Sequence, residues 1–234
     1  MSQAYFQFKQ FTVRHDLCAM KVGTDGAVLG AWADCSRAQS ALDVGAGSGL
    51  IALMLAQRSN AAVDAVDIDE NACRQSKINF ENSPFGGRMR IFNADYRNFQ
   101  PGRKYDLIVS NPPYFSRSLK PPLAERSFAR HDEALPTEIL ISKSASLMNE
   151  NSRLSLIIPT DKMENTAQTA EKYGLHLRRK TEVYSLPTKP PKRVLLEFTN
   201  CKADLEEDKL TIETSPKIYS SEFVRLLKEF YLKL

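Results

Sequence analysis

Residues 41–56 read ALDVGAGSGLIALMLA. The first four predict a short apolar strand, and residues 50–56 predict an almost wholly apolar helix. Gly45, Gly47 and Gly49 lie between them, where glycines let the backbone approach a ligand and the N–H groups of a helix start face it. This layout predicts an α/β protein with a nucleotide-type site. The spacing is not the G-x-G-x-x-G of dinucleotide enzymes, and no Gly-Lys-Ser/Thr follows, which argues against a P-loop.

A second predicted strand, residues 62–66, ends at Asp67. Asp67 follows the glycines by roughly 20 residues, the offset at which a carboxylate accepts the hydroxyls of a ribose. We expect Ile68 to pack on an adenine face and Asp69 to cap a helix over residues 70–80. The alternative is that Asp67 and Asp69 are only cap and turn residues.

The third predicted strand, residues 89–92, leads into Asn93, Ala94 and Asp95. A carboxylate just beyond this strand can accept a hydrogen bond from an adenine amino group. We therefore place Ala94 and Asp95 in the same candidate site, while a simple turn aspartate remains an equal interpretation.

The fourth predicted strand, residues 105–110, delivers Asn111-Pro112-Pro113-Tyr114 at its carboxyl end, the edge where open α/β sheets bind ligands. Two prolines fix two φ angles and stiffen the turn. The turn presents an amide, with an acceptor and two donors in one plane, and an aromatic face. Together they can hold an exocyclic amine and its ring. The alternative is a proline-rich turn that merely ends a strand.

The first 38 residues do not follow a βα repeat. The aromatic and apolar residues between Phe6 and Val13 alternate with polar ones, which predicts a short strand or hairpin arm. Thr24 or Asp25 is predicted to cap a helix over residues 27–33. Two interpretations stay open: a capped helix covering a sheet edge, or a lid from which Lys21 and Asp25 reach a ligand.

The composition of the chain limits the classes of protein to which it can belong. The 234 residues are 42% hydrophobic and 26% charged, as expected for one globular α/β domain with small additions. The net charge of +4 permits a polyanionic partner without requiring one. The four cysteines form no C-x-x-C pair and no disulfide framework, so we expect reduced thiols in a cytosolic protein. No apolar run approaches the roughly 18 residues that span a bilayer.

Two stretches are rich in basic residues. Residues 115–131 follow the Asn-Pro-Pro turn, and residues 172–193 lie in the second half of the chain. For the first we expect phosphate contact with a nucleic acid, the alternative being a solvated charged loop. The second can track an RNA backbone or guard a sheet edge by charge.

The second half of the chain predicts further α/β elements and a small addition. We expect helices over 136–149 and from Thr160 or Asp161 to near Gly174, with strands over 153–158, 175–184, 194–199 and 210–212. A final helix is predicted to dock on the core through residues of one face. These are Phe223, Leu226, Leu227, Phe230, Tyr231 and Leu234.

The motifs carry a resemblance. DVGAGSG, AVDIDE, the Asp95 turn and SNPPYF, in this order, resemble a Rossmann-like S-adenosylmethionine-dependent methyltransferase whose NPPY motif is similar to that of the amino-methyltransferases. KVGTDGAVLGAWA, KRVLLEF and YSSEFVRLLKEFYL extend the resemblance to bacterial tRNA1(Val) adenine-N6 methyltransferases, which modify A37 beside the anticodon.

The resemblance implies a mostly parallel seven-stranded sheet with helices on both faces and a final antiparallel strand. We expect an accessory or lid segment over 1–38, a methyltransferase domain over 39–200 and an extension over 201–234 packed on it. The implied partner is tRNA, with no metal and no membrane, in a cytoplasmic monomer.

The implied sites follow the matched motifs. Asn111, Pro112 and Tyr114 are the expected catalytic residues, and the substrate is expected to contact Tyr114, Phe115, Arg126 and Arg130. The residues expected to bind S-adenosyl-L-methionine are Lys21, Thr24, Asp25, Asp43, Gly45, Gly47, Gly49, Asp67, Ile68, Ala94, Asp95 and Asn111.

Two other functions remain open. One is methyl transfer to another acceptor: an rRNA or DNA base amine, or a protein glutamine amide, which has the same planar geometry. The other is a non-enzymatic binding module, against which the intact glycine loop, Asp67 and the NPPY turn argue. Lack of a large inserted recognition domain argues against sequence-specific duplex DNA.

Overall fold

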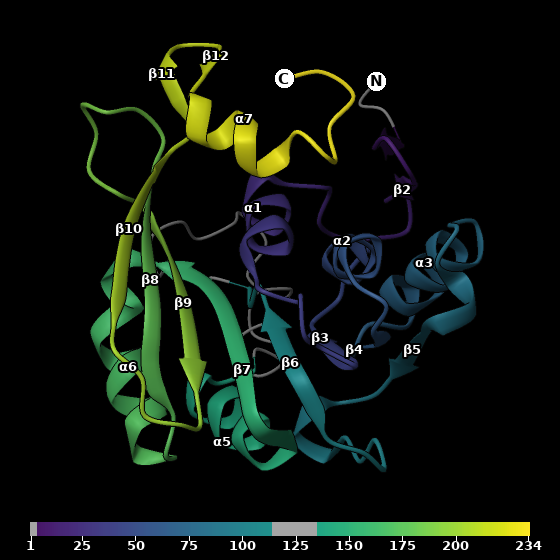
Figure 1. Ribbon diagram of the computed structural model, residues 1–234. Coiled ribbons are helices and arrows are strands. Elements are labelled where there is room, and N and C mark those ends of the chain that lie inside the picture. The colour runs from purple at the N-terminus through teal and green to yellow at the C-terminus, as the bar shows by residue number, and fades with distance from the viewer. Residues whose placement is uncertain (1–3, 114–134) are drawn as a thin grey trace, which may run out of the picture.

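The computed structural model describes residues 4–113 and 135–234 (Figure 1). At its centre is an eight-stranded sheet in the order β10-β8-β9-β7-β6-β3-β4-β5. Within this sheet β9 runs antiparallel to both neighbours, and the other pairs are parallel. The strands are β3 (Ser40–Val44), β4 (Ala62–Asp67), β5 (Met89–Asn93), β6 (Tyr105–Ser110), β7 (Met148–Pro159), β8 (His176–Tyr184), β9 (Arg193–Thr199) and β10 (Glu206–Thr211).

The Rossmann-like class is confirmed, but the predicted strand number is one too low. The additional strand is β10, which pairs in parallel with β8 at the edge of the sheet. The predicted antiparallel strand is present as β9, so it is not the final strand of the sheet. The predicted strand over 210–212 covers only the end of β10, because Leu210 is its one buried residue and its first half is acidic and exposed.

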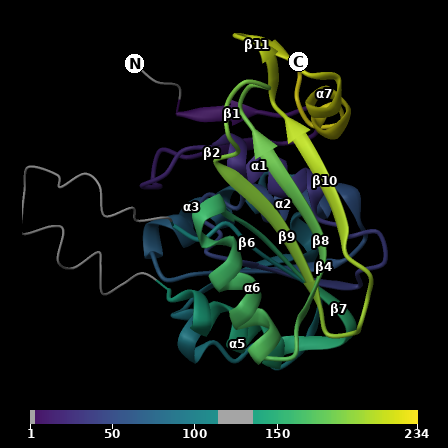
Figure 2. The same cartoon turned by 90° about the vertical axis from the view of Figure 1, so that its left-hand side faces the viewer.

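Helices cover both faces of the sheet, as predicted (Figures 1 and 2). Alternation along β6 supplies two cores: Leu107 and Val109 join one, and Ile108 joins the other. The first core includes α1 (Thr24–Trp32) and α2 (Leu50–Arg58), with α3 (Glu70–Glu81) on the same side; the second includes α5 (Thr137–Leu147) and α6 (Met163–Lys172). Three short 3-10 turns are η1 (Gly86–Arg88), η2 (Tyr96–Asn98) and η3 (Thr160–Lys162).

The two ends of the chain meet. The predicted amino-terminal hairpin is present as β1 (Tyr5–Gln7) and β2 (Thr12–Arg14). At the other end, β11 (Glu213–Ser215) and β12 (Ile218–Tyr219) precede α7 (Ser221–Leu227), whose Phe223 and Leu227 are buried. The final helix is shorter than predicted, because Phe230 and Tyr231 lie beyond its end and pair with the amino-terminal segment. Lys9 N donates to Phe230 O at 2.8 Å, and Phe8 and Tyr231 form an isolated antiparallel β-bridge.

Predicted helix caps gave mixed results. Asp69 caps α3 as expected, with its Oδ1 accepting from Asn71 N at 2.8 Å. The predicted caps of α1 are wrong, because the helix begins at Thr24 after Gly23 and has no side-chain cap. Asp25 is instead ion-paired with Arg193. Neither Thr160 nor Asp161 caps α6, which begins at Met163 after the η3 turn.

Candidate active site

The turns that follow β3, β4, β5 and β6 meet at the carboxyl edge of the sheet and line one cavity, the first cavity. Two strands of its wall are tied together, since Ser110 Oγ donates to Val44 O at 2.8 Å. The amino-terminal segment closes one side. The lining residues are Cys18, Ala19, Met20, Val44, Gly45, Gly47, Val66, Asp67, Ile68, Asp69, Ala72, Ala94, Asp95, Tyr96, Arg97, Ser110, Asn111, Pro112, Pro113 and Leu135.

The glycine loop after β3 presents its backbone to this cavity. Gly45 and Gly47 adopt positive φ angles of 74° and 56°, and a Cβ at either would meet no atom of the described residues within 4 Å. Gly49 differs: its φ is 78°, but a Cβ there would come within 2.5 Å of the Phe80 ring. Ser76 Oγ, which donates to Gly47 O at 2.8 Å, fixes the loop. The first two glycines therefore shape the cavity, and the third permits packing on α3.

Asp67 ends β4 beside this loop. Its Oδ2 accepts from Gly47 N at 2.8 Å, and its Oδ1 accepts from Asp69 N at 2.9 Å. Burial raises the pKa of this carboxyl above its usual value, although these backbone donors oppose the shift. Each carboxylate oxygen can accept more than one hydrogen bond. Asp67 thus holds the glycine loop in place and keeps acceptor capacity toward the cavity.

Asp43 lies beneath the loop and lines neither cavity described here. It is fully buried, and its Oδ2 accepts from Ala52 N at 3.1 Å. Its Oδ1 has no hydrogen-bond partner in the described part of the chain. Burial, with a smaller contribution from the charge of Asp67, raises the pKa of Asp43 to about 7. An incompletely satisfied buried carboxyl under a glycine loop is unusual for a purely structural group.

The far wall of the first cavity is formed by Ile68 and Asp95. Ile68 is 53% exposed, an apolar side chain left uncovered where a planar ring can pack. Asp95 also serves as a turn residue: its Oδ1 accepts from Arg97 N at 2.9 Å, and Arg97 Nε lies 3.3 Å from it. Ala94 N donates to Asp67 O at 3.0 Å, which joins the turns after β4 and β5.

A second cavity lies on the other side of the Asn-Pro-Pro turn. Lys21, Thr24 and Asp25 line it, and Asn111 points toward the start of α1, since a Cβ at Gly26 would lie 3.9 Å from Asn111 Nδ2. The residues shared by the two cavities are Met20, Gly45, Gly47, Asn111, Pro112 and Pro113. Every predicted site residue that the structure describes lines one cavity or both, apart from Asp43 and Gly49.

The segment before α1 is pinned beside the cavities by buried amides of α3. Asn79 Nδ2 donates to Arg14 O and Ser48 O, each at 2.8 Å, and Gln75 Oε1 accepts from Leu17 N at 3.0 Å. These contacts place Cys18 and Met20 on the first cavity, which sequence reasoning missed. Burial, then the charges of Asp67 and Asp69, raises the pKa of Cys18 to about 12, so this thiol stays protonated.

Comparison with known proteins identifies the family. The methyltransferase small domain model matches residues 23–161. The chain is 46% identical over its full length to a full-length tRNA1(Val) (adenine(37)-N6)-methyltransferase of Bacteroides fragilis. It is 47% identical, also over the full length of both chains, to the Phocaeicola vulgatus protein of that name. The chain belongs to the tRNA1(Val) (adenine(37)-N6)-methyltransferase family.

Solved structures agree on the fold of this methyltransferase. A structure described as a predicted O-methyltransferase from Agrobacterium tumefaciens superimposes with a TM-score of 0.68 at 19% identity, over 88% of this chain and 96% of that one. The magnesium protoporphyrin IX methyltransferase of Synechocystis PCC 6803, solved with bound S-adenosylmethionine, gives a TM-score of 0.52 at 19% identity, over 75% and 76% of the two chains. At these identities the likeness shows the fold alone.

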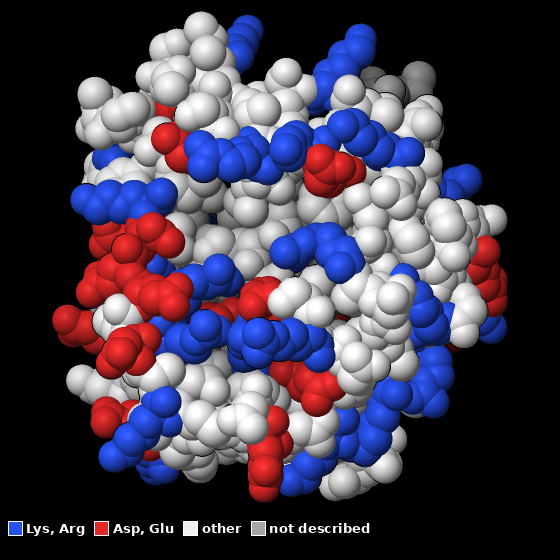
Figure 3. Space-filling model, viewed as in Figure 1, with Lys and Arg blue, Asp and Glu red and all other residues white. Residues whose placement is uncertain are grey.

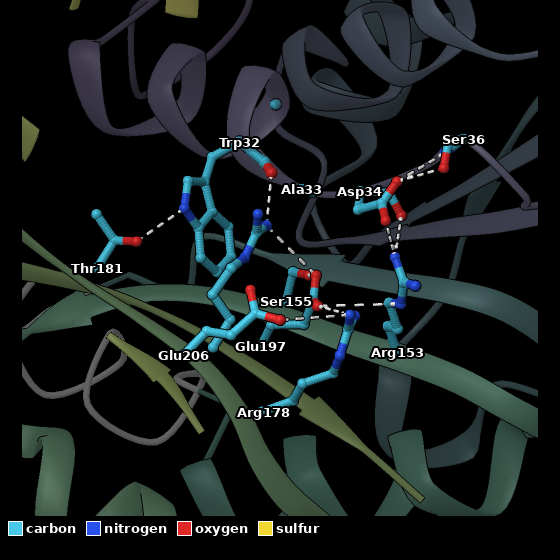
Figure 4. Close-up of polar contacts among 12 residues, drawn as sticks. Trp32, Ala33, Asp34, Ser36, Arg153, Ser155, Arg178, Thr181, Glu197 and Glu206 are labelled. Carbon is cyan, nitrogen blue, oxygen red and sulfur yellow. Dashed lines mark hydrogen bonds and ion pairs between the residues drawn. The ribbon is translucent and has the colours of Figure 1, made fainter. Parts of the chain in front are cut away.

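The two basic stretches of the methyltransferase have different outcomes. Tyr114, Phe115, Arg126 and Arg130 lie outside the described residues, as does the rest of the first stretch. Within the second, the charges on β8 are compensated by carboxylates of neighbouring strands. Arg178 lies 3.1 Å from Glu197 of β9 (Figure 4). Arg179 lies 3.5 Å from the same carboxylate, and Lys180 lies 2.6 Å from Glu207 of β10. Figure 3 shows basic and acidic side chains next to one another on the face where β8 and β10 lie.

Two further expectations concern absences. In residues 4–113 and 135–234, no group of three or more His, Cys, Asp or Glu side chains is arranged to hold a metal ion. Among the helices of the same residues, none is both long and apolar enough to cross a membrane.

Proposed function

We propose that this chain transfers a methyl group from S-adenosyl-L-methionine to the exocyclic N6 of adenine in tRNA, at A37 of tRNA1(Val). The observation that carries the proposal is the position of Asn111. It stands in the wall shared by the two cavities, and we assign the first to the cofactor and the second to the acceptor. This assignment places Lys21, Thr24 and Asp25, which the sequence led us to expect at the cofactor, on the acceptor side. Full-length relatives at 44–47% identity carry the name of this reaction.

The first cavity fits S-adenosylmethionine, which when bound supplies an electrophilic methyl group on a sulfonium. Gly45 and Gly47 leave the space that such a ligand needs, and Asp67 retains acceptor capacity for ribose hydroxyls. Ile68 offers an apolar face to a purine, and Asp95 lies beside it as an acceptor for its amino group. Asp43, which lines neither cavity, supports the loop from beneath by accepting from Ala52 N at 3.1 Å.

The Asn-Pro-Pro turn positions the acceptor. The Asn111 side-chain oxygen and the Pro112 carbonyl accept the two N6 hydrogens, which directs the nitrogen lone pair out of conjugation with the ring and toward the donor. Positive charge develops on N6 during transfer, and these two acceptors stabilise it. The attacking amine becomes more acidic as the bond forms, so its surplus proton passes to water and the residues present need supply no strong base. Positioning therefore contributes most of the rate.

The adenine must leave its loop to reach Asn111, as base-modifying enzymes require. Stacking of the flipped base on Tyr114 and contacts to Phe115, Arg126 and Arg130 remain predictions. So do the cytoplasmic location, the monomeric state and the role of residues 1–38 as a lid. The pinning of residues 14–17 to α3 supports a segment fixed beside the ligand.

The test uses labelled S-adenosylmethionine with purified protein and four acceptors: unmodified bulk tRNA, rRNA, duplex DNA and a release factor. Digestion and chromatography identify the labelled product. We expect N6-methyladenosine in one tRNA species. Label in glutamine would move the acceptor to a protein amide, and label in none of the four would contradict the proposed reaction.

A further inference from the structure

The connection between β8 and β9, residues 185–192, reads SLPTKPPK and contains two lysines and no acidic residue. It projects beyond the ends of the two strands in both views (Figures 1 and 2). Lys189 and Lys192 are exposed, and neither forms an ion pair with a residue that the structure describes. Arg193 follows directly as the first residue of β9. We call residues 185–193 the basic connection.

The basic connection is held at the carboxyl edge of the sheet. Because β9 is antiparallel, its first residue lies opposite Pro159, the last residue of β7. Thr160 N donates to Lys192 O at 3.3 Å, and Thr160 Oγ1 donates to Pro191 O at 3.0 Å. Three prolines in eight residues limit its backbone further. Its cations are therefore anchored at the edge that carries Asn111.

Arg193 brings this charge to the acceptor side of the site. It lines the second cavity, which also contains Asn111 and Pro112. Its Nε donates to Asp25 Oδ2 at 2.8 Å and its Nη1 to Lys192 O at 3.1 Å, so the guanidinium is oriented by both sides of the cavity mouth. An oriented, planar guanidinium matches the geometry of a phosphate.

Other cations of the second basic stretch are committed elsewhere. Arg178 and Arg179 are bound to Glu197, and Lys180 to Glu207, on the face of the sheet. In the first cavity, by contrast, carboxylates predominate, with Asp67, Asp69 and Asp95 in its lining. Positive charge at this edge therefore gathers beside the second cavity.

We propose that the basic connection binds the sugar-phosphate backbone of the RNA substrate. Arg193 takes a phosphate of the nucleotide whose base meets Asn111, and Lys189 and Lys192 take phosphates of its neighbours. This inference rests on the proposed function. A base held at Asn111 carries its sugar and phosphates away from the first cavity, because that cavity holds the cofactor, and so toward the second cavity and its mouth.

The experiment measures binding of unmodified tRNA1(Val) transcript, without cofactor, over a range of salt concentrations. The variants are Lys189→Gln, Lys192→Gln and Arg193→Gln. The matched control is Arg37→Gln, which removes the same charge at the opposite edge of the sheet, just before β3. We expect each variant to weaken binding about 3- to 10-fold at low salt and to reduce the salt slope by about 0.7 to 1, while the control matches wild type.

Asp25→Asn separates phosphate binding from a purely structural ion pair. If the pair only anchors α1 to β9, Arg193→Gln and Asp25→Asn will weaken RNA binding and lower the Tm alike. A phosphate site instead predicts that only Arg193→Gln weakens RNA binding, because Asp25→Asn leaves the guanidinium in place and removes a nearby negative charge.

Two results overturn the inference alone: tRNA binding of the three variants equal to that of Arg37→Gln, or a loss confined to S-adenosylmethionine affinity in Arg193→Gln. The second would assign Arg193 to the carboxylate of the cofactor. If wild-type protein neither binds nor methylates tRNA, the proposed function itself fails.

Discussion

Two fully buried carboxylates, Glu197 and Asp43, have opposite surroundings. Glu197 on β9 lies 3.1 Å from Arg178 and 3.5 Å from Arg179, with Arg153 at 3.9 Å. Asp43 on β3 has one backbone donor, one oxygen without a partner among the described residues, and a raised pKa. The charge of Glu197 is compensated by arginines of the protein itself. Beneath the glycine loop, by contrast, Asp43 keeps one acceptor oxygen that no described residue satisfies.

The largest effect on stability is expected at Glu197. Glu197→Gln removes the shared partner of three partly buried arginines. Arg153 keeps Asp34 and Arg178 keeps Glu206, so the charge of Arg179 loses most of its compensation. We expect the free energy of unfolding to fall by about 3–5 kcal/mol. Urea denaturation measures it. Glu206→Gln is the control, because that exposed carboxylate lies 3.9 Å from Arg178 and should contribute less than about 1 kcal/mol. Equal losses of unfolding free energy in Glu197→Gln and Glu206→Gln would contradict this expectation.

The glycine loop allows a second test within five residues. Gly49→Ala places a Cβ 2.5 Å from Phe80, and Gly47→Ala places one in open space. In both variants, an alanine at a positive φ angle costs about 1 kcal/mol of stability. We expect Gly49→Ala to lose a further 1–3 kcal/mol of stability from overpacking. Gly47→Ala should mainly weaken S-adenosylhomocysteine binding, measured by calorimetry. Unchanged affinity in Gly47→Ala would show that the loop does not face the cofactor.

A third effect concerns pH and Asp43. Its folded pKa of about 7 lies above the value near 3.9 expected in the unfolded chain. The protonated form therefore stabilises the fold below about pH 4, and this contribution is lost as pH rises to about 7. We expect Asp43→Asn to be less sensitive to pH in this window. Urea unfolding at several pH values compares the two proteins, and identical pH profiles would count against the burial argument.

Local features of the site could be predicted from sequence. The glycine loop, Asp67 and the Asp69 cap each depend on residues within one strand–turn–helix unit. Asn111 could be placed at the carboxyl edge because a buried apolar strand precedes it. These features depend on contacts between residues close together in the sequence, so the order of the residues is enough to predict them.

Long-range features could not be predicted. Arg193 lies at the second cavity because β9 pairs with β7 in an antiparallel register. Asp25, which was predicted to cap α1, forms an ion pair with Arg193 instead. Met20 and Cys18 line the first cavity because side chains of α3, more than 50 residues later, hold their segment. None of these contacts leaves a periodic pattern in the sequence.

The central claim is that the Asn111 amide positions the acceptor amine for methyl transfer. The most direct measurement is single-turnover methylation of tRNA by Asn111→Ala, with Tm and S-adenosylhomocysteine affinity recorded on the same protein. The account predicts a methyl-transfer rate lower by about 100- to 1,000-fold in a protein that remains folded and still binds the cofactor analogue. Near wild-type turnover in Asn111→Ala would contradict it.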